Sequence, residues 1–424
     1  MILKPSTLAQ KIIARAAGLE AVIPGSVVTA SVDLAMIHDS GGPRRVEPIL
    51  QDLGVGLFDA SKVVLIADHF VPGDTPEAAE ILQLTRQWAI KKQVSFYDGE
   101  GICHVVLPQR GHLKPGMFLV GGDSHSPTGG AFGAYMFGIG ATEMAGVLAT
   151  GEIWIKVPQT ILIEWQNTLP YGVMAKDMML ATCKKLGMDG GQYQAIEYTG
   201  EAITALSMQE RMTLSNMAAE LGAQAGLIAP DQTTADFVQA TGNDPGDWQH
   251  LNTDPSSELL AHHVFDAAQL TPQVAAPHSP ANAMPVAQAN NQAVDIAYIG
   301  ACTGAKYEDL RAAATVLKGH KLAKATELRV APASAQDQKR AEEDGIMAVF
   351  EQAGALILPN ACGICAGYGS GRLGENVTCI SSTARNFQGR MGAASSQVWL
   401  GSPLTVAASA ITGIITDPRE FLHE

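Results

Sequence analysis

Charged side chains are scarce in this sequence of 424 residues. Asp, Glu, Lys and Arg make up 17% of it, below the roughly 25% that is usual for soluble domains. A surface so poor in charge indicates a chain that a partner covers in part, and therefore a subunit of an assembly. The 28 basic side chains face 42 acidic ones, which gives a net charge of −14. This balance argues against nucleic acid as a partner, because binding it needs a concentrated basic face.

The sequence also lacks a long hydrophobic run, a leader and a set of paired cysteines. Residues 391–416 carry no charge, but Ser, Gln, Gly and Pro interrupt them, so they do not predict a membrane span. Residues 2–17 contain Lys4, Lys11 and Arg15 and lack the apolar core of a signal peptide. Six cysteines are too few for a disulfide framework in a chain of this length. We therefore expect a protein of the reducing cytoplasm with no membrane partner.

Short apolar runs alternate with alanine-rich helical stretches, and this alternation predicts the α/β class with parallel sheets. The strand-like runs are residues 63–67, 116–122, 161–165 and 294–300. Three of them are followed at once by polar residues or a cysteine, at the position where open α/β sheets bind ligands. We therefore look for a functional site at the ends of these runs.

Two breaks in the pattern predict the domain organisation. Residues 270–293 hold four prolines and show no apolar period, which is typical of a linker. A softer boundary lies near Pro158. The sequence thus predicts three α/β units, residues 1–158, 159–293 with the linker at the end, and 294–424.

A helix is predicted from Ser207 to about Gly222, because Ser207 and Glu210 have the spacing of an N-terminal capping box. Asn216 and Glu220 lie four residues apart and would project from one face of this helix. On spacing alone, a solvated polar face is favoured over a binding role for this pair.

Three cysteines carry the strongest chemical signal. Cys362 and Cys365 form a CxxC motif shortly after a strand-like run, and Cys302 ends another strand in the same unit. A zinc site would need a fourth ligand, which Cys379 could supply. A redox pair needs only the CxxC motif, and chance also produces so short a pattern. From spacing alone, a metal or cluster role has even weight against redox chemistry and chance together.

Histidines next to aspartates or glycines form a second signal. The set consists of Asp68, His69, His104, Asp123 and His125, and the pair His38 and Asp39 is a weaker fourth case. One such histidine is more often structural. Three of them with two nearby aspartates favour an acid–base set, because a neighbouring carboxylate fixes the imidazole tautomer and raises its basicity.

Two arginines form a third signal. Arg385 and Arg390 lie five residues apart in an otherwise uncharged stretch, which suits bidentate capture of carboxylates. A structural ion pair or a solvated loop would explain their spacing equally well.

Several motifs together, in their order along the chain, resemble the aconitase / isopropylmalate dehydratase family. They are GDSHSPTGGAFG (122–133), RMTLSNM (211–217), GLIAP (226–230), ACT with EDL (301–303 and 308–310), ACGIC (361–365) and RNFQGR (385–390). The likeness spans nearly the whole chain. It implies three α/β domains of the aconitase type around a central cluster.

The resemblance also implies a cofactor, a reaction and residue roles. The cofactor would be a [4Fe–4S] cluster held by Cys302, Cys362 and Cys365, with one iron left open as a Lewis acid. The reaction would be dehydration and rehydration of a hydroxy di- or tricarboxylic acid. By matching motifs, His69 with Asp68 resembles the proton-donor pair, and His104, His125 with Asp123, and Glu220 resemble the residues that handle water and hydroxyl. The substrate-binding set would be Ser124, Asn216, His38, Arg385 and Arg390.

The resemblance implies a partner as well. Longer family members carry a C-terminal swivelling domain with a catalytic serine base and a further arginine. This chain ends at Glu424 with no such domain, so it resembles the large subunit of a two-chain enzyme that a small subunit completes. The leading substrate is 3-isopropylmalate or a related alkyl-substituted malate. The alternatives are 2,3-dimethylmalate, citramalate or homoaconitate as substrate, a non-catalytic cluster-binding regulator, and a zinc-binding structural protein.

Three positions depart from the family pattern. Gly304 and Ala384 stand where the family usually has Asn, and Gly129 stands where it often has His. Because the first two lie beside the expected cluster, we expect its surroundings to differ from those in the commonest members. No expected cluster ligand is lost.

Overall fold

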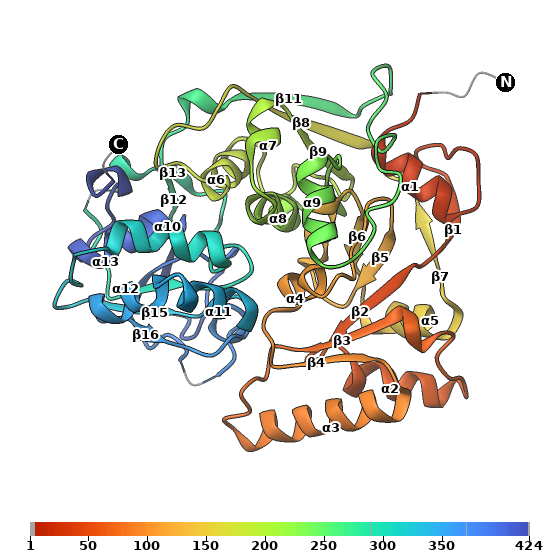
Figure 1. The fold of residues 1–424 in the computed structure, drawn as a ribbon, viewed down its shortest axis with the longest axis horizontal. Coiled ribbons are helices and arrows are strands. Elements are labelled where there is room, and N and C mark those ends of the chain that lie inside the picture. Colours follow the sequence, from red (N-terminus) through yellow and green to blue (C-terminus); the bar gives the residue numbers. More distant parts are fainter. Residues whose placement is uncertain (1–4, 290, 370, 423–424) are drawn as a thin grey trace.

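The structure is a computed structural model of the chain and describes residues 5–289, 291–369 and 371–422. Three main sheets, each from a different part of the chain, organise these residues (Figure 1). The α/β class predicted from the alternating runs is confirmed. The chain end at Glu424, which entered the prediction of a missing domain, lies outside the described residues.

The first sheet contains five parallel strands in the order β4-β3-β2-β5-β6. These are β2 (Leu34–His38), β3 (Val63–Ala67), β4 (Ser95–Asp98), β5 (Phe118–Gly121) and β6 (Tyr135–Gly138). Strand β3 coincides with the predicted run 63–67. Its alternate residues enter different hydrophobic clusters, Val64 and Ile66 on one face and Val63 and Leu65 on the other. A parallel sheet covered on both faces requires such a continuous apolar run.

Helices cover this sheet and leave its carboxyl ends open to the other units. They are α1 (Leu8–Ala16), α2 (Pro43–Asp52), α3 (Pro76–Lys92), α4 (Cys103–Gln109) and α5 (Ala141–Thr150). Helix α2 contacts both α3 and α5, and the α2–α3 pair forms the lower border of the molecule in Figure 1. A separate antiparallel ribbon pairs β1 (Val27–Ser31) with β7 (Glu152–Lys156).

The second sheet contains four parallel strands in the order β10-β9-β8-β11. These are β8 (Thr160–Gln166), β9 (Ala195–Thr199), β10 (Ala225–Ile228) and β11 (Ala261–Asp266), with helices α6 (Ala175–Leu186), α7 (Glu201–Ala205), α8 (Met208–Met217) and α9 (Gln232–Ala240). The predicted helix 207–222 is confirmed as α8 followed by the 3-10 turn η3 (Ala218–Leu221). Ser207 caps α8 by accepting from the Glu210 N–H, but the Glu210 carboxylate accepts from Ala175 N–H instead of closing a capping box.

The third sheet has seven strands in the order β13-β12-β18-β17-β14-β15-β16. These are β12 (Gln273–Ala275), β13 (Ala283–Pro285), β14 (Ile296–Ile299), β15 (Glu327–Val330), β16 (Leu356–Ile357), β17 (Thr378–Ser381) and β18 (Gln397–Gly401). Its helices are α10 (Tyr307–Leu317), α11 (Ala335–Glu343), α12 (Ile346–Ala353) and α13 (Pro403–Thr412). Strands β14 to β18 pair in parallel.

The predicted linker, residues 270–293, needs correction. It contains β12 and β13, which form an antiparallel pair, and β12 also pairs with the distant β18. Strands of three residues are too short to show a hydrophobic period, and their partner lies more than a hundred positions further along the chain. The boundaries at 158 and 293 themselves stay a prediction.

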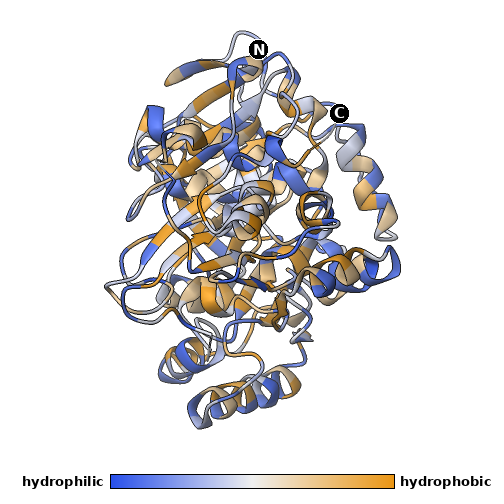
Figure 2. Cartoon of the chain, turned by 90° about the vertical axis from the view of Figure 1, so that its left-hand side faces the viewer, coloured by the Kyte–Doolittle hydropathy of each residue, from blue (hydrophilic) through white to orange (hydrophobic). Residues whose placement is uncertain are grey.

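Hydrophobic residues concentrate in the strands and central helices, whereas the outer helices carry long hydrophilic stretches (Figure 2). Within the described ranges, no helix has both the length and the apolar character that crossing a bilayer requires.

Candidate active site

Loops from the first and third units meet at a cavity of about 350 Å³. Every predicted site residue lines it except Asn216 and Glu220, which lie one contact away; the lining set is His38, Asp68, His69, His104, Asp123, Ser124, His125, Cys302, Cys362, Cys365, Arg385 and Arg390. Most of these residues follow the carboxyl ends of parallel strands, where open α/β sheets place ligands. A larger groove of about 710 Å³ beside β7 contains none of them.

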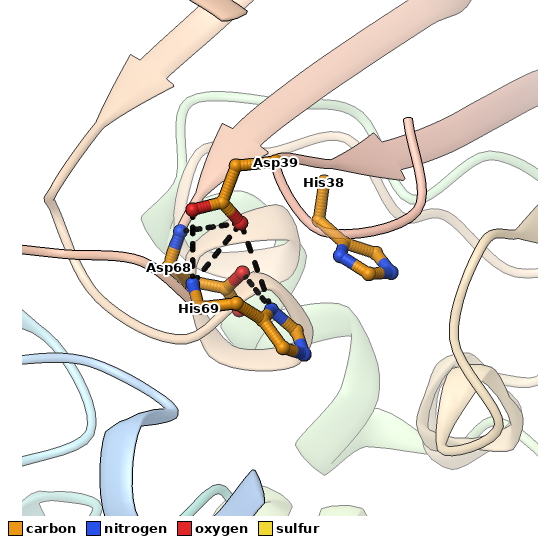
Figure 3. A group of neighbouring side chains, drawn as sticks. All are labelled: His38, Asp39, Asp68 and His69. Carbon is orange, nitrogen blue, oxygen red and sulfur yellow. Dashed lines mark hydrogen bonds and ion pairs between the residues drawn. The ribbon is translucent and has the colours of Figure 1, made fainter. Parts of the chain in front are cut away.

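His69 is held by the carboxylate of its neighbour in the chain. Its Nδ1 lies 2.6 Å from Asp68 Oδ1, and both side chains are buried (Figure 3). Burial alone would lower the pKa of His69, but the charge of Asp68 and the hydrogen bond to it raise that pKa to about 9. His69 is therefore an imidazolium at neutral pH, with Nδ1 already engaged.

Asp39 also belongs to this group, although the sequence indicated it only as part of the weaker His38–Asp39 pattern. Its carboxylate accepts from the backbone N–H group of His69 at 3.0 Å (Figure 3). It also accepts from the backbone N–H group of Phe70 at 2.8 Å. Asp39 thus fixes the loop that carries Asp68 and His69. The only available signal was its place at the end of β2, beside His38.

The imidazole ring of His38 lies face to face against that of His69. The two rings stack with centroids 4.3 Å apart and an interplanar angle of 21°. Its Nε2 lies 2.9 Å from the Gly122 carbonyl oxygen, while its Nδ1 is buried without a hydrogen-bond partner among the described residues. Burial and the charge of His69 lower the pKa of His38, so the stack pairs a neutral imidazole with an imidazolium.

A second group is centred on Asp123. His104 Nε2 lies 2.7 Å from Asp123 Oδ1, and the same oxygen accepts from the His125 N–H at 2.7 Å. Burial would raise the pKa of Asp123, but the hydrogen bonds from the two histidines hold it well below its usual range. One carboxylate thus orients two imidazoles.

Glu220 links this group to the second and third units. Its Oε1 lies 3.0 Å from His125 Nε2 and accepts from Arg385 Nε at 2.6 Å. Arg385 also donates from Nη1 to Ser124 Oγ at 2.8 Å. The pair Asn216 and Glu220, read from spacing alone as a solvated face, is instead buried. That interpretation is wrong because α8 and η3 are covered on the predicted polar side.

The three cysteines face the same cavity from two loops. Asn216 donates from Nδ2 to Cys302 Sγ at 3.1 Å, and the Cys362 N–H donates to the Asp68 carbonyl. A hydrogen bond from Cys362 and the Arg390 guanidinium lower the pKa of Cys365, although burial raises it. Arg390 Nε has no hydrogen-bond partner among the described residues. This arrangement favours a thiolate at Cys365 beside the positive charge of Arg390.

The zinc alternative does not fit this geometry. Four-coordinate zinc with Zn–S bonds of about 2.3 Å places its sulfur ligands roughly 3.8 Å apart. Across the described residues, no group of three cysteines has its sulfur atoms within 4.8 Å of one another. Cys379 lies in the core of the third unit and does not line the cavity. The three cysteines of the cavity therefore do not form a single-zinc site of the four-sulfur kind.

Two buried lysines, which the sequence analysis missed, support these loops. Lys306 Nζ donates to the Cys302 carbonyl oxygen at 2.9 Å and to Thr213 Oγ1 at 3.0 Å. Lys176 Nζ donates to the carbonyls of Ser382 and Thr383, just before Arg385. The full burial of both side chains is a tertiary property that composition and motif spacing do not reveal.

Two departures from the family pattern have steric reasons. A Cβ on Gly304 would lie 2.3 Å from Cβ and Oγ of Ser382, so a side chain at 304 requires a different residue or position at 382. A Cβ on Gly129 would lie 2.8 Å from Cβ and Sδ of Met136. Ala384 is 2% exposed and packs in the core of the second unit.

Comparison with known proteins agrees with this site. The chain is 45% identical over 98% of its length to the 3-isopropylmalate dehydratase large subunit 1 of Methanopyrus kandleri, and the match covers 99% of that protein. It is 40% identical to the probable methanogen homoaconitase large subunit of Methanothermobacter thermautotrophicus, over 97% of each chain. Among solved structures, aconitase X of Thermococcus kodakaraensis has a similar fold, with a TM-score of 0.50, 13% identity, and 89% and 88% of the two chains covered.

A family model covers most of the chain as well. The model of the aconitase family (aconitate hydratase) matches residues 63–413, a range that contains every predicted site residue except His38. Proteins of this family bind an iron–sulfur cluster, and the three cysteines that line the cavity are the residue type that holds such a cluster. Fold, donor set and sequence therefore agree that the chain belongs to the aconitase family and is a hydro-lyase.

Proposed function

We propose that this chain is the large, cluster-binding subunit of an enzyme that removes water from a hydroxy acid with two or more carboxylates and adds it back. One observation carries the proposal. Three cysteines, an imidazolium fixed by a carboxylate, and two arginines line the same cavity of about 350 Å³. Dehydration of such an acid needs these three elements: a Lewis acid, a proton donor and carboxylate-binding cations.

His69 is the proposed proton donor. Hydroxide is a poor leaving group, so its departure must be assisted by a proton. Asp68 occupies Nδ1 of His69, while Nε2 makes no hydrogen bond to any described residue and remains to pass its proton to the leaving oxygen. A pKa of about 9 keeps this proton in place at neutral pH.

Arg385 and Arg390 are the proposed carboxylate-binding residues. Arg385 uses Nε and Nη1 for Glu220 and Ser124, and its Nη2 has no partner within the described part of the chain. The Arg390 guanidinium donates no hydrogen bond to an oxygen of the described residues and lines the cavity beside Cys365. Guanidinium groups held in this way suit bidentate recognition of a carboxylate.

We propose a [4Fe–4S] cluster at Cys302, Cys362 and Cys365. When bound, it would supply one iron without a cysteine ligand as the Lewis acid for the substrate hydroxyl. The chain's own residues prepare the site: Asn216 orients the Cys302 sulfur, Lys306 fixes its carbonyl, and Arg390 offsets negative charge at Cys365.

The names of the relatives support two substrate candidates. The leading one is 3-isopropylmalate or a related alkyl-substituted malate. It is the substrate in the names of the relatives from Methanopyrus kandleri and Aquifex aeolicus, which are 45% and 39% identical to this chain. The second is a hydroxy tricarboxylic acid of the homoaconitate type, after the relative at 40% identity. A small subunit that closes the cavity and a cytoplasmic location complete the proposal.

Anaerobic purification and metal analysis test the cofactor. We expect about four irons and four sulfides per chain in the wild type. Cys365→Ser should lower both, whereas Cys379→Ser should leave both unchanged because Cys379 lies outside the cavity. Stoichiometric zinc without sulfide would overturn the proposal.

Turnover tests the reaction and the partner. We expect the holo-protein to hydrate and dehydrate substituted malates or tricarboxylates only when a small subunit is added. Full activity of the chain alone would refute the need for a partner. No activity with any hydroxy acid, in the presence of the co-purifying small subunit and an intact cluster, would refute the reaction.

A further inference from the structure

The mouth of the cavity is bordered by the amino end of helix α2. Ser40 and Gly41, just before the helix, line the cavity. Gly42 is the N-cap and provides no side-chain cap. The N–H groups of Ser40, Gly41 and Arg44 donate no hydrogen bond to any described residue. Such uncapped N–H groups at the positive end of a ten-residue helix favour an anion.

An unpaired arginine lies at the same place. Arg45 lines the cavity and makes no hydrogen bond or ion pair to the residues that the structure describes. Its neighbour Arg44 lies over the Phe70 ring, 5.6 Å from the centroid, and does not line the cavity. Two adjacent arginines of one helix turn thus face different surroundings.

A third feature is an unpaired polar atom on a residue that lines the same cavity. The imidazole of His38 is 3% exposed and lines the cavity beside Gly41, where a Cβ would lie 3.3 Å from Cε1 and Nε2 of the ring. Its Nδ1 is buried without a partner among the described residues. A buried polar atom left unpaired costs about 1–3 kcal/mol, so such atoms usually await a ligand or a water molecule.

We propose that Arg45, the N-terminus of α2 and His38 form a subsite for a carboxylate on the variable arm of the substrate. Arg385 and Arg390 come from the third unit and are assigned to the carboxylates of the malate core. Arg45 comes from the first unit and serves an additional acidic group. The preferred substrate is then a hydroxy tricarboxylic acid, because an alkyl arm would desolvate the guanidinium without pairing it.

This inference rests on the proposed hydro-lyase function and reverses the order of its two substrate candidates. It also gives Arg45 a role as a specificity-determining residue. The position of Arg45 at the rim lets it contact the arm of a substrate whose hydroxyl lies deeper, near the cysteines.

Binding of two unreactive anions tests the subsite without turnover. The probes are propane-1,2,3-tricarboxylate and 2-isopropylsuccinate, titrated calorimetrically into the purified holo-protein, Arg45→Gln and Arg44→Gln. We expect the wild type to bind the tricarboxylate at least about tenfold more tightly than the alkyl diacid. Arg45→Gln should abolish this preference, and Arg44→Gln, a matched loss of charge one residue away, should keep it within about twofold.

The outcomes separate this subsite from the proposed reaction. A preference that Arg45→Gln leaves within twofold of the wild type, an equal loss in both variants, a wild-type preference for the alkyl diacid, or no binding of either anion would each overturn the subsite. The reaction fails on a different observation, namely no turnover by an intact cluster protein with its small subunit.

Discussion

The two histidine groups of the first sheet use the same side chains in different ways. In one group, His38, Asp39, Asp68 and His69 lie at the ends of β2 and β3 (Figure 3). The two carboxylates there have separate roles, since Asp68 pairs with an imidazole and Asp39 holds the backbone. The contacts of this group stay among these four residues and their loop, and they surround the single protonated imidazole of His69.

The contacts of the other group extend beyond the first unit. Asp123 serves both His104 and His125, and His125 continues to Glu220 and Arg385 in the other two units. The charged side chains of the second group are therefore connected by successive contacts that join all three units. In the proposed reaction, the first group would hold a proton on His69, and the second would orient water and substrate across the unit boundaries.

The largest effect is expected when His69, the proposed proton donor of the first group, is replaced. His69→Gln removes the proposed donor, and general acid–base catalysis contributes about 10²–10⁴-fold to a rate. We expect kcat to fall by about 10³-fold while cluster content and binding of an unreactive tricarboxylate stay near wild type. The check is steady-state kinetics beside iron and sulfide analysis. A variant with unchanged kcat would show that the donor lies elsewhere.

A smaller effect is expected when the negative charge of Glu220 is removed from the second group. Glu220→Gln removes the charge that joins His125 to Arg385, so both side chains lose an ionic partner. We expect kcat/KM to fall by about 10²-fold, with a rise in KM because Arg385 is no longer fixed. Glu210→Gln is the matched control on the adjoining helix α8, since Glu210 lies outside the cavity. Equal losses in both variants would contradict a specific role for Glu220.

The difference between the groups also shows what the sequence could reveal. His69, His104 and His125 were found because each lies within three residues of a glycine or an aspartate, a local pattern. The joining of Asp123 to two histidines and of Glu220 to Arg385 depends on the packing of three units, so spacing alone predicted only a solvated face. Asp39, Lys176 and Lys306 act on backbone atoms, and no motif marks such a role. The hairpin β12–β13 was hidden for a similar reason, because its partner strand β18 is distant in the chain.

A still smaller effect is expected when the first group keeps His69 but Asp39, which holds the backbone of its loop, is replaced. Asp39→Asn replaces one of the two acceptor oxygens with an amide that faces N–H donors. An unpaired buried donor costs about 1–3 kcal/mol, so we expect a lower melting temperature and a fall in kcat of about tenfold. Ser61→Ala, which removes an exposed hydroxyl far from the cavity, is the control for loop changes. Loss of stability without any loss of kcat would limit Asp39 to a folding role.

A carboxyl with no histidine or arginine beside it completes the comparison. Glu197 in β9 is 4% exposed, and Thr253 Oγ1 donates to its Oε2 at 2.5 Å. Burial raises its pKa to about 7, the reverse of the lowered pKa of Asp123. The folded state thus binds a proton that the unfolded state releases above about pH 4.5. The stability that this proton contributes is present below that pH and is lost as pH rises to about 7.

Glu197→Gln should remove this dependence without changing turnover, because Glu197 lies outside the cavity. A raised pKa of this size corresponds to about 3 kcal/mol. Relative to the wild type, the variant should therefore gain about that much stability between pH 4.5 and pH 8. Melting temperatures of both proteins across this range are the measurement. A difference between them that is the same at both ends would mean that Glu197 keeps an ordinary pKa, and that burial alone does not separate it from the paired carboxylates of the active site.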